Sequence, residues 1–185
     1  MVYSKRRLLG WMGFVIFALL VPFAGMRFTN EINWDLSDFI IMGSVLGGIG
    51  LFYEGVIRRS QRMRFRLAWM TGILGAFLLF WVNGAVGMIG HENQEANVLY
   101  RSVLAVLLVG ALISRCKSKG MAITMFLMAI VQMAVPVTAL IIWPPSEISW
   151  APSVFGVFLL SSFFAFLFFI SGVLFKRSHR GEKRS

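Results

Sequence analysis

Residues 91–97 form a distinctive polar segment between two predicted apolar runs. They read His-Glu-Asn-Gln-Glu-Ala-Asn, and Arg101 follows one helical turn later. Carboxylates, amides and a guanidinium in one place offer directional hydrogen bonds and charges that bind small polar solutes. A solvated turn that binds nothing is the alternative interpretation. The candidate ligand-binding residues of this segment are Glu92, Asn93, Asn97 and Arg101.

Three acidic residues nearer the N-terminus extend this candidate cluster. Glu31 and Asp35 lie between two apolar runs and Asp38 lies at the start of the second, all on the membrane side predicted for residues 91–97. Together these residues would form a polar mouth at that surface. A membrane enzyme that acts on lipids is a further interpretation, but no catalytic motif accompanies the cluster. We therefore predict no catalytic residue.

Two amide side chains, Asn83 and Gln132, lie inside apolar runs. Polar side chains inside a membrane are costly and mark functional positions. Each amide either makes an interhelical hydrogen bond or contributes to a ligand cavity. Both residues are therefore included among the candidates for a cavity.

No metal or cofactor site is predicted. His91 and Glu95 have the spacing of two ligands on one helix face, but one histidine with loose carboxylates is a weak metal signal. The chain has a single cysteine and two histidines. These counts indicate neither a cysteine-held metal nor a haem held by two histidines on facing helices.

The composition places these residues in a membrane protein. The 185-residue chain is 58% hydrophobic and 14% charged, whereas roughly 25% of an average soluble domain is charged. A chain of this size cannot bury so much apolar surface in a water-soluble core, which excludes a soluble enzyme, and a disordered chain is excluded as well. Apolar runs of about 20 residues cross a bilayer as helices. We predict an all-α polytopic transmembrane helical bundle, a single domain over residues 1–185, with six spans at residues 8–26, 37–57, 67–90, 98–114, 121–143 and 153–175.

Helix-end signals fit these spans. Asp35 or Ser37 is expected to cap the second span, Asn97 the fourth and Ser153 the sixth. The proline pair at residues 144–145 is expected to end the fifth span.

The basic residues predict the orientation. Of the 18 lysines and arginines, all but Arg27 and Arg101 lie on one side of a six-span chain. The positive-inside rule then places both termini, including a basic tail at residues 176–185, in the cytoplasm. The net charge of +10 therefore indicates topology and attraction to anionic lipid head groups, not nucleic-acid binding. A cleaved signal peptide is the competing interpretation of the first span.

Glycines predict where helices pack. Gly84, Gly87 and Gly90 recur every third residue and would form a narrow strip along the third span, and Gly43 and Gly47 are paired in the second span. Small residues let neighbouring backbones approach closely. We therefore expect the second and third spans at the buried centre, and the phenylalanine-rich sixth span at the lipid-facing rim.

Two predicted outer loops are similar to each other. Residues 31–39 read E-I-N-W-D-L-S-D-F and residues 147–155 read E-I-S-W-A-P-S-V-F. Either the hairpin of the first two spans is repeated in the last two, or helix starts at a membrane surface simply favour a tryptophan and a capping serine.

Residues 83–100 resemble a family of small, uncharacterised bacterial integral inner-membrane proteins with the pattern N-x-A-V-G-x-I-G-x-E-[DN]-x-x-A-N-x-x-Y. His91 and Glu95 depart from the turn of that family. The resemblance implies a multi-pass protein of the bacterial inner membrane and implies no activity. The matching residues are Asn83, Ala85, Val86, Gly87, Ile89, Gly90, Glu92, Asn93, Ala96, Asn97 and Tyr100.

Two functions fit these observations. The polar mouth and the intramembrane amides favour a helical bundle for small-solute or ion transport, or for ligand binding. The small size and the abundant phenylalanine and methionine, which pack adaptably, favour a non-catalytic accessory or scaffolding subunit of a larger membrane complex. A homo-oligomer is compatible with either function.

Overall fold

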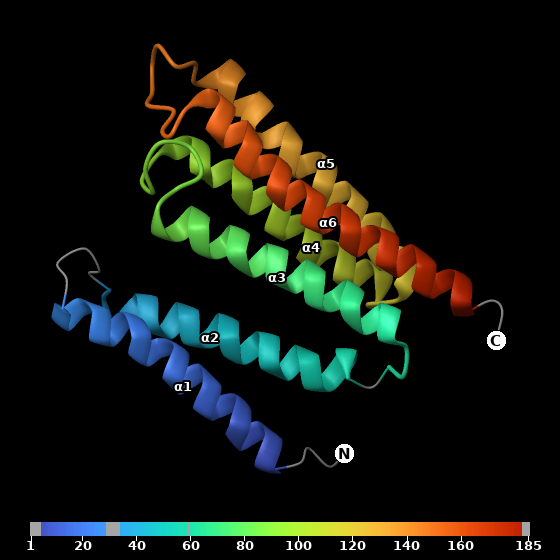
Figure 1. Ribbon diagram of the computed structural model, residues 1–185. Helices are drawn as coiled ribbons and strands as arrows, with labels where there is room; N and C mark the ends of the chain where they lie inside the picture. Colours follow the sequence, from blue (N-terminus) through green and yellow to red (C-terminus); the bar gives the residue numbers. More distant parts are fainter. Residues whose placement is uncertain (1–4, 29–33, 59, 183–185) are drawn as a thin grey trace. The chain divides into compact units, whose positions relative to one another are not determined.

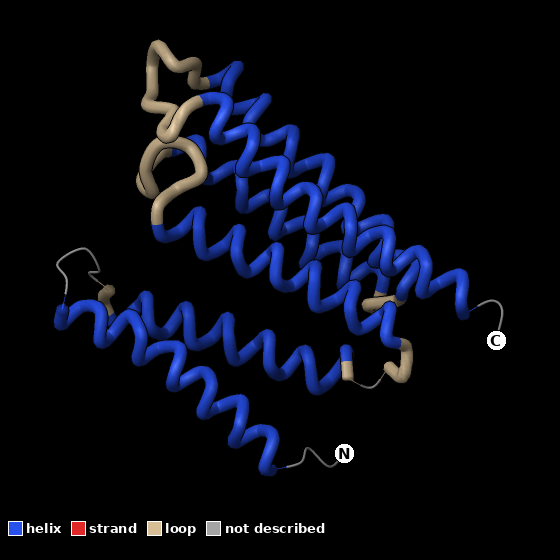
Figure 2. The backbone as a smooth tube through the Cα atoms, viewed as in Figure 1, coloured by secondary structure: helices blue, strands red, loops and turns tan. Residues whose placement is uncertain are grey.

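The computed structural model describes residues 5–28, 34–58 and 60–182, and all the regular structure in these ranges is helical (Figure 1, Figure 2). A π-helical turn, η1, continues α2, and a 3-10 turn, η2, precedes α4. The elements are α1 (Lys5–Phe28), α2 (Leu36–Phe52), η1 (Tyr53–Ile57), α3 (Met63–Ala85), η2 (Glu95–Leu99), α4 (Tyr100–Ser114), α5 (Ser118–Ile142) and α6 (Val154–Glu182).

Six helices in the described part of the chain are long and apolar enough to cross a membrane. Each one contains most of an apolar run predicted from the sequence. A helix satisfies its backbone groups within its own segment, as a lipid surrounding requires. The prediction of an all-α, six-span chain is confirmed, and the protein is a multi-pass integral membrane protein.

Two helix ends differ most from the prediction. α3 ends at Ala85, so the third span does not reach residue 90. α6 continues past Phe175 to Glu182. Residues 176–182 therefore extend the last helix, because lysine, arginine and glutamate are good helix formers.

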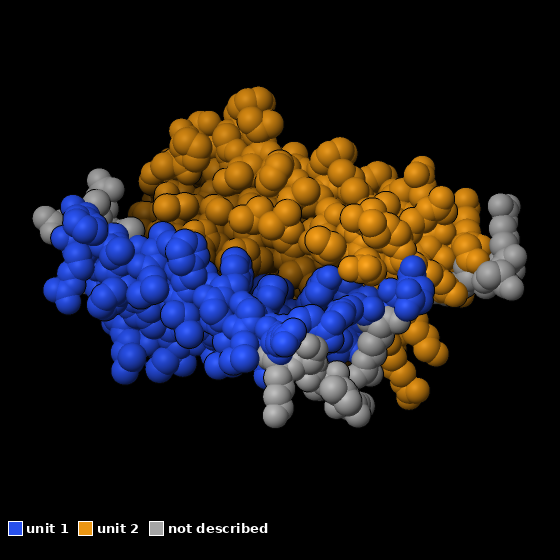
Figure 3. Space-filling view, turned by 60° about the horizontal axis from the view of Figure 1, so that its bottom comes forward, with its two compact units in different colours: residues 1–61 blue, residues 62–185 orange. Residues whose placement is uncertain are grey.

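The helices fall into two compact units, which Figure 3 colours separately. Unit 1 is Met1–Gln61 and contains α1, α2 and η1, whereas unit 2 is Arg62–Ser185 and contains the remaining elements. Two units that each pack internally can share one bilayer. The single domain over residues 1–185 therefore stays a prediction.

Unit 1 is a hairpin of α1 and α2. The indole Nε1 of Trp11 donates to the carbonyl of Leu46 at 3.1 Å, and its ring lies against Gly50, where a Cβ would collide with it. Gly43 has an ordinary van der Waals contact with α1, but nothing lies within 4 Å of a Cβ built on Gly47. Within unit 1, Gly50 rather than Gly47 is therefore the glycine that admits a bulky side chain of α1. The packing role expected for Gly47 stays a prediction.

A capping box fixes the start of α2. The carboxylate of Asp35 accepts from the N–H of Asp38 at 3.0 Å, and the carboxylate of Asp38 accepts from the N–H of Asp35 at 2.9 Å. The Ser37 hydroxyl, which donates to Asp35 at 2.6 Å, and the Asp38 N–H lower the pKa of Asp35. The cap is therefore complete above the ordinary carboxyl pKa and is lost as the pH falls through the lowered value. Of the two caps that the sequence allowed, Asp35 and Ser37, the structure has Asp35.

Unit 2 is a four-helix bundle in which α6 packs on both α3 and α5, and α4 packs on α5 and α3. In α6, 39% of the most apolar stretch is buried, against 33% in α3 and 17% in α2. Phe164 and Phe168 of α6 are buried, whereas Phe155 and Phe166 are exposed. The expected placement of the sixth span at the rim is therefore wrong, because α6 is the most buried helix of unit 2. The central position expected for the second and third spans stays a prediction. Phenylalanine suits both lipid and a protein interior, so its abundance does not distinguish the two.

Gly72 and Gly75 bring α3 close to α6. A Cβ on Gly72 would lie 2.9 Å from the hydroxyl oxygen of Ser171, and a Cβ on Gly75 would lie 3.0 Å from the ring of Phe168. The same serine donates to the carbonyl of Ala68 at 2.7 Å. The close approach of α3 to α6 therefore occurs near the middle of α3.

The connection between α5 and α6 follows its sequence signals. α5 ends at Ile142, before the proline pair at residues 144–145. The Ser153 hydroxyl oxygen accepts from the N–H of Gly156 at 3.0 Å. Both expected helix ends are confirmed.

The two similar loops start their helices at different positions. Alignment of residues 31–39 with residues 147–155 pairs Ser37 with Ser153, yet α2 is capped by Asp35. Residues 31–33 of the first copy lie outside the described residues. The repeated hairpin therefore stays a prediction.

Candidate functional site

The loop between α3 and η2 turns on two glycines. Gly87 (φ 77°) and Gly90 (φ 71°) adopt the left-handed region, where an L side chain costs about 1–2 kcal/mol. The expectation that Gly84, Gly87 and Gly90 form one strip on a helix is therefore wrong. Of the three, only Gly84 is helical, and no heavy atom lies within 4 Å of a Cβ built on it.

The side chain of Asn97 holds this loop through four hydrogen bonds to its backbone. Its Oδ1 accepts from the N–H groups of Met88 and Ile89, both at 2.9 Å, and its Nδ2 donates to the carbonyls of Ile89 at 3.0 Å and His91 at 2.7 Å. Asn97 is only 3% exposed, so water competes little for these bonds. The expectation that Asn97 caps the fourth span is wrong, because its amide is committed to the loop.

The loop also rests on the connection between α5 and α6. The N–H of Gly90 donates to the carbonyl of Ala151 at 3.2 Å. Beside it, the buried indole of Trp150 donates to the carbonyl of Trp143 at 2.9 Å. The backbone of the loop is therefore held from two sides, by the side chain of Asn97 and by the carbonyl of Ala151.

A cavity of about 580 Å³ is lined by this loop, η2, the end of α3 and the start of α4. Five candidate residues meet there because these four segments follow one another along the chain. Asn83 comes from α3, Glu92 and Asn93 from the loop, Asn97 from η2 and Arg101 from α4. The other residues that line the cavity are Phe80, Gly84, Gln94, Glu95, Val98 and Leu104.

The cavity wall carries opposite charges and an unused acceptor. Within the described residues, the guanidinium of Arg101 makes no hydrogen bond or ion pair. Glu92 accepts a long bond of 3.4 Å from the Asn93 side chain. Asn83 donates to the carbonyl of Asn97 at 3.3 Å, while its buried Oδ1 has no partner in the same part of the chain. The wall can therefore bind a cationic group, an anionic group and a hydrogen-bond donor.

The remaining candidates lie elsewhere or are not described. Asp35 and Asp38 belong to unit 1, where they form the capping box. Glu31 lies outside the described residues. Gln132 is fully buried in α5, and neither atom of its amide has a hydrogen-bond partner among the described residues. The interhelical hydrogen bond that the sequence allowed for Gln132 is therefore not made among the described residues.

Replacement of Gln132 by methionine should raise the free energy of unfolding of the protein by about 1 kcal/mol. Methionine has a similar shape and leaves no polar atom unpaired in the interior. The melting temperature in detergent measures the change. The matched control is Gln61→Met at an exposed position, which should have no effect. A lower melting temperature for Gln132→Met would contradict the assignment of an unsatisfied amide.

A second hollow of about 250 Å³ shares residues 93–95 with the first and is also lined by His91 and Trp143. His91 and Glu95 do not lie on one helix, because η2 begins at Glu95. In the ranges that the structure describes, no three or more His, Cys, Asp or Glu residues are grouped to hold a metal.

Sequence reasoning missed several polar residues of unit 2. The Tyr100 hydroxyl and the Ser161 hydroxyl share a buried hydrogen bond of 2.9 Å between α4 and α6. Ser161 is one of few polar residues in a phenylalanine-rich run, and the scarcity of polar residues there was the available signal. Gln94 and Glu95 also line the cavity, and their place in the polar turn could have added them to the candidates.

Comparison of the chain with models of known protein families, with curated proteins and with solved structures finds no match. The resemblance of residues 83–100 to small bacterial membrane proteins therefore stays a prediction. The cavity itself is the feature that indicates a function.

Proposed function

We propose that this membrane protein binds a small polar solute in the cavity between α3, η2 and α4, as a ligand-binding or transport protein. One observation carries the proposal. Asn83, Glu92, Asn93 and Arg101 converge on a single cavity, and the guanidinium there has no partner within the described residues.

The chemistry of the wall favours a small zwitterion such as an amino acid. A guanidinium binds a carboxylate through charge-assisted hydrogen bonds. Glu92 and Glu95 can accept from an ammonium group, and the Asn83 Oδ1 can accept one further bond. A solute with one charge would leave part of this wall unpaired.

The resemblance of residues 83–100 implies a location in the bacterial inner membrane, and the distribution of basic residues supports an orientation with both termini in the cytoplasm. In that orientation the loop that carries Glu92 and Asn93 faces the outside. The cavity would then receive solute from the outer side.

The test measures the melting temperature of the detergent-purified protein with glycine, alanine or glutamine, and with acetate or methylammonium as singly charged controls. The zwitterions should raise the melting temperature more than the controls do. Arg101→Gln should weaken zwitterion binding by about 10-fold to 100-fold, because a hydrogen bond to a charged group contributes about 1.5–3 kcal/mol. Uptake of labelled solute into proteoliposomes separates transport from binding alone.

Two variants serve as matched controls for loss of charge. Arg64 lies at the opposite end of α3 and Glu147 lies in the connection between α5 and α6, and both are exposed. Arg64→Gln and Glu147→Gln should leave the response to zwitterions unchanged. If Arg64→Gln and Arg101→Gln reduced the response to zwitterions equally, the assignment of Arg101 to the binding site would be wrong. A stoichiometric partner in mild detergent, without any response to zwitterions, would support the accessory subunit instead.

A further inference from the structure

Unit 1 contains an apolar groove of about 310 Å³ along the seam of its hairpin. Residues 8–16 of α1 form one wall, and residues 47–54 of α2 and η1 form the other. The lining side chains are apolar except for Glu54 at one end. Such a surface suits a hydrocarbon chain rather than a polar solute.

Glycine and tryptophan shape this groove. Gly47 contributes no side chain, and nothing lies within 4 Å of a Cβ built on it. Trp11, which also lines the groove, is held by its bond to the Leu46 carbonyl and by its contact with Gly50. The groove is thus open at Gly47 and bounded by a fixed indole ring.

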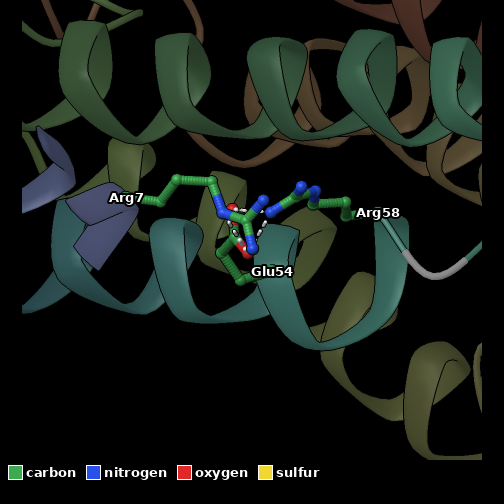
Figure 4. A network of polar contacts seen from close by, with 3 residues as sticks. All are labelled: Arg7, Glu54 and Arg58. Atoms are coloured by element: carbon green, nitrogen blue, oxygen red, sulfur yellow. Dashed lines mark hydrogen bonds and ion pairs between the residues drawn. The ribbon is translucent and has the colours of Figure 1, made fainter. Parts of the chain in front are cut away.

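A cluster of two arginines and one glutamate closes the polar end of the groove. Arg58 donates two hydrogen bonds to the carboxylate of Glu54, at 2.9 Å and 3.2 Å, and the Nε of Arg7 lies 3.8 Å from the same carboxylate (Figure 4). The i,i+4 pair of Glu54 and Arg58 is one that the sequence spacing allows. Two guanidiniums share one carboxylate, so the cluster carries an excess positive charge.

This excess charge is accessible to a ligand. The side chain of Arg7 is 46% exposed and that of Arg58 is 37% exposed. Glu54 lies in the π-helical turn η1, and π-helical turns occur frequently at functional sites. The cluster can therefore bind an anionic group without losing its internal ion pairs.

We propose that this groove binds an acyl chain of an anionic phospholipid, whose phosphate lies against Arg7 and Arg58. Residues 8–16 of α1 extend over about 12 Å at 1.5 Å per residue. One leaflet of hydrocarbon is about 15 Å thick, half of the bilayer core. A lipid with its head group at the arginines would therefore lie along the groove in the same direction as its neighbours in that leaflet.

Charge complementarity selects an anionic lipid over a neutral one. A basic residue near the surface of an anionic membrane contributes about 1 kcal/mol of attraction. Guanidiniums also donate paired hydrogen bonds to phosphate oxygens. The site is independent of the solute cavity, because its described residues all belong to unit 1.

The test is native mass spectrometry of the full chain, purified in detergent and supplied with phosphatidylglycerol or phosphatidylcholine of identical acyl chains. The wild-type protein should retain more phosphatidylglycerol than phosphatidylcholine. Arg7→Gln should reduce this preference by about 5-fold, the equivalent of about 1 kcal/mol. Arg6→Gln is the matched control, because the adjacent arginine lies about 100° around the helix, and it should leave the preference unchanged.

A second pair of variants tests the groove itself. Gly47→Leu should reduce retention of both lipids, because the new side chain fills the groove. Gly48→Leu adds the same side chain at an exposed glycine that does not line the groove, and it should have no effect. Circular dichroism and melting temperatures check that all four variants fold.

Three outcomes would overturn the lipid site. Equal retention of the two lipids by the wild-type protein would show that the site does not select for anionic lipid. Equal effects of Gly47→Leu and Gly48→Leu on lipid retention would show that lipid does not bind in the groove. Loss of a protein dimer, rather than of lipid, in Gly47→Leu would show that a second copy of the chain covers this surface.

Discussion

Replacement of Asn97 by alanine is expected to lower the free energy of unfolding by about 3–5 kcal/mol. The change leaves the N–H groups of Met88 and Ile89 and the carbonyls of Ile89 and His91 without their side-chain partner. Each buried group that loses its partner costs about 1–3 kcal/mol, and water that enters the space offsets part of this. The melting temperature in detergent should fall, and the response to zwitterions should fall with it.

The four hydrogen bonds of the Asn97 side chain act as a clamp on the loop. Two companion variants test whether stability depends on this clamp or only on a polar side chain in the loop. Asn97→Asp keeps an acceptor for Met88 and Ile89 but loses both donors, so its stability should lie between those of wild type and Asn97→Ala. Asn93→Ala removes an exposed amide whose side chain donates to Glu92, and it should change stability by less than about 0.5 kcal/mol. Equal melting temperatures for Asn97→Ala and Asn93→Ala would show that the loop does not depend on the clamp.

Alanine should have opposite effects at glycines that look equivalent in the sequence. At Gly87 or Gly90 it should lower the free energy of unfolding by about 2–4 kcal/mol. At Gly84 it should leave stability unchanged or raise it by up to about 1 kcal/mol, because alanine is the better helix former. Denaturation of the three purified variants under the same conditions provides the comparison.

The difference arises from backbone conformation and from neighbouring backbone atoms. A Cβ on Gly87 would lie 2.6 Å from the carbonyl of His91, and a Cβ on Gly90 would lie 2.7 Å from the carbonyl oxygen of Ser149. These neighbours are main-chain atoms, which cannot rotate away as a side chain can. If the three glycines formed a packed strip on one helix, Gly84→Ala would lower the free energy of unfolding as much as the other two changes. That result would contradict a loop that turns at Gly87 and Gly90.

The six spans could be predicted because their signal is a simple length. An apolar run of about 20 residues has few alternatives to a membrane helix. Residues close together in the sequence were also sufficient to predict where two helices start. The cap at Asp35 and the cap at Ser153 each depend on residues within three positions of the cap.

Part of the cavity could also be predicted, since its residues are close together in the sequence. These residues lie between positions 83 and 101, in one helix–loop–helix segment, so polarity was enough to group them. They are Asn83, Glu92, Asn93, Asn97 and Arg101. The role of Asn97 was not predictable, because an asparagine before a helix is as compatible with a cap as with a clamp on a loop. Asp35 and Asp38 share the acidic character of the other candidates, yet they serve their own helix.

Helix packing could not be predicted from composition. A three-residue glycine spacing fits a helical strip and a loop with two left-handed residues equally well, and only the backbone of Gly87 and Gly90 decides between them. The same applies to α6, whose phenylalanines divide between the interior and the surface according to which helices lie beside them. These distinctions depend on contacts between segments far apart in the chain.

The bonds that hold the loop after α3 involve only its main chain. Asn97 and Ala151 contact N–H and carbonyl groups, whereas the side chains of Glu92 and Asn93 take no part in these bonds. Substitutions at these two positions can therefore alter which molecules are recognised while the architecture that presents them persists. This separation makes the loop a suitable starting point for engineering new selectivity.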